Sequence, residues 1–155
     1  MNTGDTVDDF ELSDETGTPR RLSALLADGP VVLFFYPMAM SGGCTREACH
    51  FRDLAAEFAA AGAQPVGISS DGVAAQERFA STHSLGYPLL SDEGNRVAKG
   101  LGAYRRFLPG GLHTRRVTFV IDCDRTLLGE VSSETQFDRH ADEALKILRS
   151  RKASA

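Results

Sequence analysis

The chain has 155 residues, of which 42% are hydrophobic, and its formal net charge at pH 7 is −4. This length suits a single domain, residues 1–155, with one hydrophobic core. The first ten residues lack the basic and apolar segments of a signal peptide, and no apolar stretch approaches the ~20 residues that span a bilayer. We therefore predict a cytoplasmic protein without a membrane partner. The acidic balance and the lack of a basic stripe argue against nucleic acid as a partner.

The N-terminal part is predicted to contain a hairpin, a short helix and a buried strand. Extended segments at Phe10–Leu12 and Arg20–Leu22 flank a turn and form the hairpin, which we expect to cover the edge of a sheet. Ser23 is the predicted N-cap of a helix that ends at Leu26. The apolar run Val31–Phe35 then predicts a strand that is buried on both faces.

A short loop connects this strand to the next predicted helix. Pro37 cannot donate a hydrogen bond to a strand ladder and is expected to end the strand. Apolar residues at helical spacing from Phe51 to Phe58 predict a helix, which ends at Gly62. A strand follows at 65–69, so these elements form a βαβ unit, whose crossover implies a parallel pair of strands.

The remaining elements complete an α/β pattern. They are a helix at 73–83, an extended piece at 87–90, a helix at 95–100, a hairpin of strands at 117–121 and 126–131, a helix at 138–148 and a frayed tail at 149–155. This order fits a thioredoxin-like fold, in which a central mixed β-sheet is flanked by helices, with the N-terminal hairpin as an extension.

Cys44 lies near the N-terminus of the helix that follows the loop. The free N–H groups and the helix dipole favour an anion there, so its thiolate should form at a lower pH than that of an ordinary thiol. The pattern therefore predicts a nucleophilic sulfur. The chain has three cysteines, Cys44, Cys49 and Cys123, which are too few for a disulfide framework. Catalytic, metal-binding or buried roles therefore remain for them.

The residues around Cys44 resemble the signature of a known family. The segment 35–37 reads Phe-Tyr-Pro, Ser41 stands three residues before the cysteine, and Thr45, Glu47 and Cys49 follow it. This pattern resembles the FYP-x-x-x-[TS]-x-x-C-T-x-E-x-C signature of the peroxiredoxins, in the bacterioferritin-comigratory or Q-type subgroup. The resemblance extends from about residue 4 to about residue 148, and it implies the same thioredoxin-like fold.

The resemblance implies a thiol peroxidase that needs no cofactor. Cys44 would attack the O–O bond of hydrogen peroxide or an organic hydroperoxide and become a sulfenic acid, and Cys49 would resolve it as an intrachain disulfide. Thioredoxin or a similar dithiol would then recycle the enzyme, as a monomer or weak homodimer. Pro37 would shield the cysteine from solvent, and Tyr36 belongs to the same motif as a supporting residue.

The chemistry also needs donors for the attacked peroxide and the departing oxygen. Ser41 and the Cys44 backbone N–H are two candidates, and Arg116, in the Arg-Val-Thr-Phe segment, is the position of the family's active-site arginine. Arg115 is adjacent, and strand alternation sends only one of the two side chains to the site. Glu47 is expected to steady the Arg116 guanidinium or the loop.

Two alternative functions remain open. One is a thioredoxin-like dithiol exchanger or redox sensor, although the chain has no Cys-x-x-Cys motif. The other is a structural zinc site made by Cys44, Cys49, His50 and Cys123, although their spacing is poor for a zinc ligand set. Otherwise we expect His50 to be packed or solvated and Cys123 to be a free thiol.

The chain departs from the family pattern just before Cys44. The subgroup often has Thr-Pro-Gly there, whereas this chain has Ser41, Gly42 and Gly43, which we expect to loosen the loop and slow the chemistry. Met38 and Met40 are expected to line the rim of the site or to pack there. The two cysteines of the motif should lie on one helix, which would have to unwind before they could pair.

Overall fold

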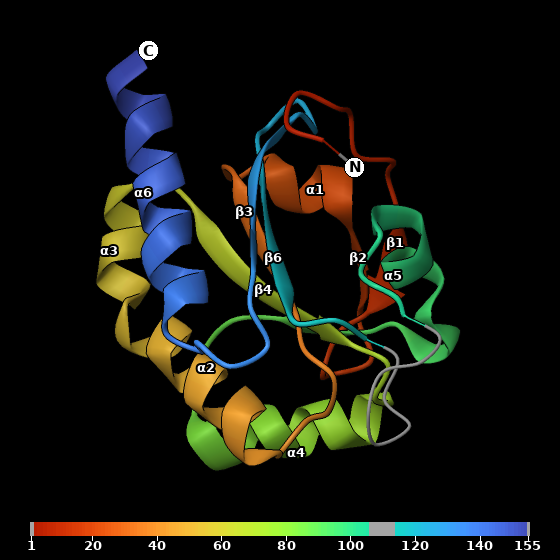
Figure 1. Cartoon of the computed structure of the whole chain (residues 1–155). Helices are drawn as coiled ribbons and strands as arrows, with labels where there is room; N and C mark the ends of the chain where they lie inside the picture. The colour runs from red at the N-terminus through yellow and green to blue at the C-terminus, as the bar shows by residue number, and fades with distance from the viewer. Residues whose placement is uncertain (1, 106–113, 155) are drawn as a thin grey trace.

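The computed structural model describes residues 2–105 and 114–154, with side chains described as far as Arg151. A five-stranded sheet in the order β5-β4-β3-β6-β7 forms its centre (Figure 1). β3 pairs in parallel with β4 and β4 with β5, whereas β3–β6 and β6–β7 are antiparallel. The strands are β3 (Val31–Phe35), β4 (Gln64–Ser69), β5 (Leu89–Ser91), β6 (Val117–Ile121) and β7 (Leu127–Ser132). The predicted mixed sheet and parallel β3–β4 pair are confirmed.

Helices cover both faces of this sheet, and strand β3 shows why. All five of its residues are buried, as predicted, because alternate side chains enter two separate cores. Leu33 and Phe35 enter the core under α1 (Leu22–Leu26) and α5 (Arg96–Leu101). Phe34 enters the other core, which is covered by α2 (Gly42–Asp53), α3 (Ala55–Ala60), α4 (Val73–His83) and α6 (Arg139–Ser154).

The N-terminal hairpin consists of β1 (Glu11–Ser13) and β2 (Pro19–Arg21), close to the predicted positions. It packs against β5, the edge strand of the central sheet, as expected. The predicted cap of the helix that follows is wrong. Arg21 is the N-cap of α1, and Ser23 instead donates its backbone N–H and its hydroxyl to the Asp9 carboxylate, at 2.9 and 2.8 Å. An acid from the preceding loop therefore takes the place of a local cap.

The helix predicted to run from the loop to Gly62 is broken in two. Leu54 separates α2 from α3, with φ −97° and ψ 15°, and its N–H bonds to the carbonyls of both His50 and Phe51. The break keeps Phe58 fully buried and its ring stacked on that of Phe51, with 5.6 Å between the centroids. Tertiary packing thus overrides the continuous helical pattern of the sequence.

The last helix is longer than predicted, because α6 continues past Leu148 to Ser154. Arg151 on this extension pairs with Asp122 at 2.9 Å, next to the turn between β6 and β7. The frayed tail predicted at 149–155 also includes residue 155 and the side chains of residues 152–154, which lie outside the described part of the chain. Within that described part, none of the helices is both long and apolar enough to cross a membrane.

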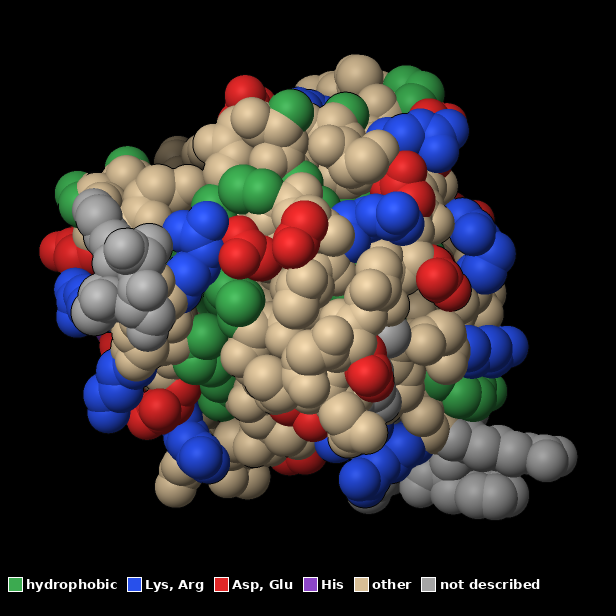
Figure 2. Space-filling model, turned by 90° about the horizontal axis from the view of Figure 1, so that it is seen from above, with side chains coloured by type: hydrophobic (Ala, Val, Ile, Leu, Met, Phe, Trp, Pro, Cys, Tyr) green, Lys and Arg blue, Asp and Glu red, His purple; other side chains and the backbone are tan. Residues whose placement is uncertain are grey.

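Viewed from above, basic and acidic side chains are interspersed over the surface (Figure 2). Polar contacts also join elements that are distant in sequence. Arg46 of α2 pairs with Asp138, just before α6, at 3.2 Å, and His50 of α2 lies 2.8 Å from Asp142 of α6. The outer surfaces of α2 and α6 are therefore joined by polar contacts.

Candidate active site

The loop between β3 and α2 is held from the side of β4. The Ala39 N–H donates to Asp71 Oδ2 at 2.8 Å, and the Ser69 hydroxyl donates to the same oxygen at 2.6 Å. Met40 has φ 68°, in the left-handed region that costs a non-glycine residue roughly 1 kcal/mol. The side chains of Met38 and Met40 are about half exposed, at 45% and 44%. The loop is thus anchored at Ala39, whereas its two methionines face outward.

Helix α2 presents one buried stripe to the sheet. Its buried residues are Cys44, Glu47, Ala48 and Phe51, which is the spacing of one helical face. Phe51 fixes the orientation of this face, because its ring stacks on Phe34 of β3 with 4.2 Å between the centroids. The thiol of Cys44 and the carboxyl of Glu47 therefore point in the same direction, under the helix.

Strand β6 brings Arg116 to this stripe. Val117 pairs with Phe35 at the end of β3, so the residue before Val117 lies beside the start of the loop that leads to Cys44. Strand alternation places Arg116 on the face that α2 covers, the same face as Thr118. Arg115 points elsewhere and donates to the Gly102 carbonyl and the Ser132 hydroxyl. Of the two arginines, Arg116 is therefore the one that lies beside Cys44.

The Arg116 guanidinium is almost fully buried and lies between two acidic groups. Nη2 is 3.5 Å from the Cys44 sulfur, and Nη1 donates to Glu47 Oε1 at 3.2 Å. The ring of Phe137 packs on the guanidinium, with 4.7 Å between Cζ and the ring centroid. The backbone N–H of Arg116 donates to the Glu134 carboxylate at 3.0 Å. These contacts leave the guanidinium little freedom to turn away from the sulfur.

Glu47 is fully buried, and its second oxygen is poorly supplied with donors. Oε2 lies 3.5 Å from His140 Nε2, yet none of the described protein atoms donates a hydrogen bond to it. Burial raises the pKa of Glu47 to about 8, although the Arg116 charge and hydrogen bond oppose this shift. The expected contact between Glu47 and Arg116 is thus present, in a setting that disfavours the carboxylate.

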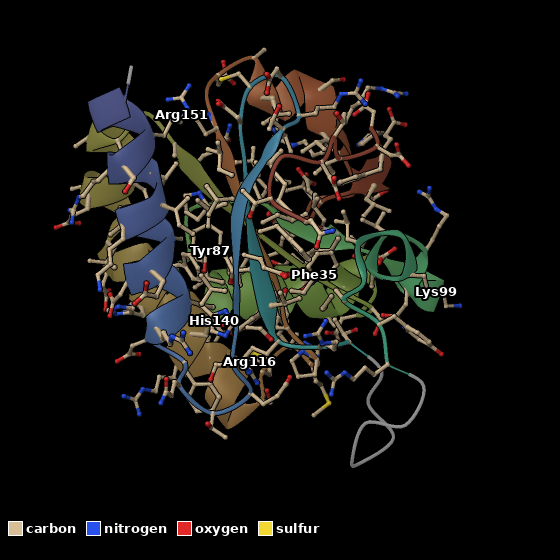
Figure 3. All side chains as sticks on the ribbon, turned by 45° about the horizontal axis from the view of Figure 1, so that its top comes forward. Phe35, Tyr87, Lys99, Arg116, His140 and Arg151 are labelled. Carbon is tan, nitrogen blue, oxygen red and sulfur yellow. The ribbon has the colours of Figure 1, made fainter. Side chains whose placement is uncertain are left out.

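His140, at the start of α6, completes the cluster and was missed from the sequence. It is fully buried, and Figure 3 shows it beside Arg116. Nε2 is 2.8 Å from the Ser133 carbonyl, which can only accept, so Nε2 carries a proton. Nδ1 is 2.8 Å from the Thr118 hydroxyl, which donates to it when the ring is neutral. Burial lowers the pKa of His140, which favours this neutral form.

A signal for His140 was present in the sequence of α6. Ala141, Ala144 and Leu148 are buried at helical spacing, and His140 stands within this apolar stripe. A polar residue in such a position must find buried partners, which here are Thr118 and the Ser133 carbonyl. Phe137 gave no comparable signal, because it precedes the helix.

The other predicted residues of the motif lie around Cys44 without bonding to its sulfur. Ser41 is the N-cap of α2, but its hydroxyl donates to the Met38 carbonyl at 2.9 Å rather than capping the helix. Pro37 is half-buried just after β3. Tyr36 is fully buried, and its hydroxyl donates to Gln76 Oε1 of α4 at 2.5 Å, which ties the end of β3 to that helix.

The two glycines before Cys44 have different surroundings. A Cβ at Gly42 would meet no atom within 4 Å, whereas a Cβ at Gly43 would come within 2.7 Å of the Phe137 ring and 3.3 Å of Arg116 Nη2. Gly43 therefore lets Phe137 approach α2 closely. The glycine at position 43 has a packing reason that the sequence did not reveal, and of the two glycines only Gly42 is open to substitution.

The three cysteines are free thiols in different environments. Cys44 is buried, Cys49 is half-buried further along α2, and Cys123 is exposed. Cys123 lies beyond the far end of β6 from Arg116, and five strand residues span ~17 Å. The proposed zinc set therefore does not come together. Elsewhere in the described residues, no group of three or more His, Cys, Asp and Glu side chains is placed to hold a metal ion.

Chemically, the arrangement suits a sulfur nucleophile. The Cys44 sulfur lies in the first turn of a helix that has no side-chain cap, and a permanently charged donor is beside it. Arg116 can stabilise both a thiolate and an oxyanion that forms next to it. The fold and this site together define a thioredoxin-like protein with a buried cysteine–arginine pair.

Comparison with known proteins identifies the family. The AhpC/TSA family matches residues 3–128. The crystal structure of peroxidoxin BcpB from Mycobacterium tuberculosis is 60% identical, with a TM-score of 0.91 over 97% of both chains. Peroxiredoxin Q of Xanthomonas campestris is 28% identical, with a TM-score of 0.83 over 91% of this chain and 90% of that one. The chloroplastic peroxiredoxin Q of Arabidopsis thaliana is 40% identical over 96% of this chain and 68% of its own length.

The chain therefore belongs to the AhpC/TSA family, and the relatives named above are peroxiredoxins, including Q-type and bacterioferritin-comigratory forms. Both the predicted family and the predicted fold are confirmed. Membership of this family implies thiol-dependent reduction of a peroxide with the help of a reductant.

Proposed function

We propose that the protein reduces hydrogen peroxide and organic hydroperoxides with Cys44 as the nucleophile. The observation that carries this proposal is the 3.5 Å contact between Arg116 Nη2 and the Cys44 sulfur, within a buried cluster. The thiolate attacks one peroxide oxygen, the O–O bond breaks, and sulfur becomes a sulfenic acid. Arg116 and the N–H groups of the first α2 turn stabilise the departing oxygen, while Ser41 can turn its hydroxyl from Met38 toward the peroxide.

We further propose that Cys49 resolves the sulfenic acid and that thioredoxin or a similar dithiol then reduces the disulfide. Both cysteines lie in α2, and five residues of a regular helix separate their Cα atoms by roughly 8–9 Å. A disulfide needs Cα atoms within about 4.4–6.8 Å, so the first turns of α2 must unwind before the two sulfurs meet. The half-buried position of Cys49 makes it accessible once they do.

Peroxide consumption by three proteins tests this assignment. Wild type, Cys44→Ser and Cys49→Ser are compared with dithiothreitol and then with thioredoxin and its reductase. Cys44→Ser should be inert, while Cys49→Ser should complete one oxidation and accumulate a sulfenic acid. Cys123→Ser is the matched control and should behave as wild type. Equal activity in all of these proteins would reject the mechanism, and disulfide exchange without peroxide consumption would favour a dithiol exchanger.

A further inference from the structure

Arg116 is one cation that faces two acids. Its guanidinium is 3.5 Å from the Cys44 sulfur and 3.2 Å from Glu47 Oε1, and the exposed fractions of the Arg116 and Glu47 side chains are 7% and 0%. If both acids were ionised, the buried cluster would carry one uncompensated negative charge. An unpaired buried charge costs several kcal/mol, so the two ionisations must oppose each other.

Among the described residues, none of the other groups around Glu47 provides a second positive charge. Burial lowers the pKa of His140 from α6, which favours its neutral form, and in that form Nε2–H donates to the Ser133 carbonyl while Nδ1 accepts from the Thr118 hydroxyl. The Tyr87 hydroxyl donates to the Ala48 carbonyl at 2.6 Å, and burial raises the pKa of this phenol, so it stays neutral. Glu134 adds negative charge, which further raises the pKa of Glu47. Arg116 is the cation that this cluster offers to Glu47.

We propose that Glu47 is protonated while Cys44 is a thiolate and ionises when Cys44 becomes a sulfenic acid, so that Arg116 faces one negative charge in both states. This inference rests on the proposed function. It makes Glu47 a positioning residue that compensates charge at Arg116, without touching the peroxide. Oε2 has no hydrogen-bond partner among the described atoms, and this costs a buried carboxylate more than a buried neutral carboxyl group, which favours the protonated form.

The step balances in protons and electrons. The Cys44 thiolate forms an S–O bond, the peroxide O–O bond breaks, sulfur loses two electrons, and the departing alkoxide takes up one proton. Glu47 releases one proton at the same time, because the charge that opposed its ionisation has disappeared. The carboxylic acid, thiolate and hydroperoxide thus become a carboxylate, sulfenic acid and alcohol. The negative charge moves across Arg116 from sulfur to carboxylate, and no net proton is taken from solvent.

Proton counting and infrared difference spectroscopy test this exchange. All arms carry Cys49→Ser, so that oxidation stops at the sulfenic acid, and are mixed with hydrogen peroxide in weak buffer with a pH indicator. The pH is chosen where the ultraviolet absorbance of the thiolate shows that Cys44 is ionised. In the Cys49→Ser protein without a further substitution, we expect oxidation to remove the infrared band of one protonated carboxyl group. We also expect almost no uptake of protons from the solution. With Glu47→Gln added, that band change should be absent, and one proton should be taken up per sulfenic acid.

Glu57→Gln, at an exposed acid of α3, is the matched control and should reproduce the unsubstituted result. Uptake of one proton per sulfenic acid without a carboxyl band change in the Cys49→Ser protein would overturn the proposal, even if Glu47→Gln did not fold. Failure of the proposed function would look different. In that case mass spectrometry would show no added oxygen on Cys44, and there would be no oxidation to which a proton count could refer.

Discussion

Cys44 and Cys123 lie toward opposite ends of β6, and each has an arginine nearby. Cys44 is 1% exposed, and Arg116 beside it is shared with a fully buried acid, Glu47. Cys123 is exposed in a turn, where Arg151 is committed to the carboxylate of Asp122 at 2.9 Å. An arginine near a cysteine is therefore not enough to stabilise a thiolate. Its charge must remain available to the sulfur, and under the proposed exchange Glu47 leaves the Arg116 charge available by staying protonated while Cys44 is a thiolate.

Removal of Arg116 should produce the largest effect. Arg116→Ala deletes the charged donor at 3.5 Å from the sulfur, and loss of one such donor typically lowers a rate by about 10²–10³-fold. Arg115→Ala is the matched control, because that side chain bonds to Gly102 and Ser132 instead. Stopped-flow measurement of sulfenic acid formation compares the two. A greater loss in Arg115→Ala would show that the comparison rests on the wrong arginine.

The acid behind Arg116 should make stability depend on pH. Folding raises the pKa of Glu47 from an ordinary value of 4.5 to about 8, so the folded protein holds this proton more tightly than the unfolded chain. The resulting stabilisation is complete below pH about 4.5 and is lost as the pH rises toward 8, by an amount on the order of a few kcal/mol. Denaturant unfolding of wild type and Glu47→Gln across this range measures it. The stability of wild type relative to the variant should fall with rising pH, and a rise would contradict a protonated Glu47.

The sequence predicted this site where local rules decide the outcome. Helical spacing placed Glu47 one turn after Cys44, and strand alternation allowed only one of Arg115 and Arg116 to reach the site. The resemblance to the family indicated Arg116, which lies beside Cys44. The sequence could not show that Ser41 would bond to Met38, because a hydroxyl with several partners in reach takes its direction from the surrounding fold.

Contacts between distant segments were beyond these rules. His140 joins the cluster only because α6 packs across β6 and α2, and the helix break at Leu54 depends on how Phe58 meets the same core. Gly43 in the sequence suggested a loose loop, whereas in the structure it admits the Phe137 ring. For His140 and Gly43 the decisive partners, Thr118 and Phe137, are far away in sequence, so propensity and spacing carry no information about them.

The two glycines offer a smaller test of how tightly the Cys44 region is packed. In Gly43→Ala the new methyl group would stand 2.7 Å from the Phe137 ring, so the ring must move away from Arg116. We expect a loss of about 1–3 kcal/mol in unfolding free energy together with a slower first oxidation. Thermal or denaturant unfolding and single-turnover kinetics measure both, and unchanged values would show that Phe137 does not hold the guanidinium.

Gly42→Pro is the contrasting substitution. Gly42 is the first residue of α2, a position that proline favours, and the extended ψ of 155° at Ser41 suits a residue before proline. We expect stabilisation by roughly 0.4–1 kcal/mol and a faster reaction from a stiffer loop. A rate no higher than that of wild type would remove the idea that this loop limits the chemistry.

The smallest effect is expected from the ion pairs on the outer side of α2. The Arg46–Asp138 and His50–Asp142 pairs connect α2 to the region of α6. They hold the turns of α2 that must unwind before Cys44 and Cys49 can pair. Exposed ion pairs stabilise weakly, so Asp138→Asn combined with Asp142→Asn should speed disulfide formation severalfold at most. Glu143→Gln, which breaks a pair within α6 alone, is the control.

Because faster unwinding leaves the sulfenic acid exposed to a second peroxide for less time, the double variant should also form less sulfinic acid, as mass spectrometry after a peroxide pulse would show. If sulfinic acid rose while the disulfide formed faster, the two reactions would not compete for the same intermediate.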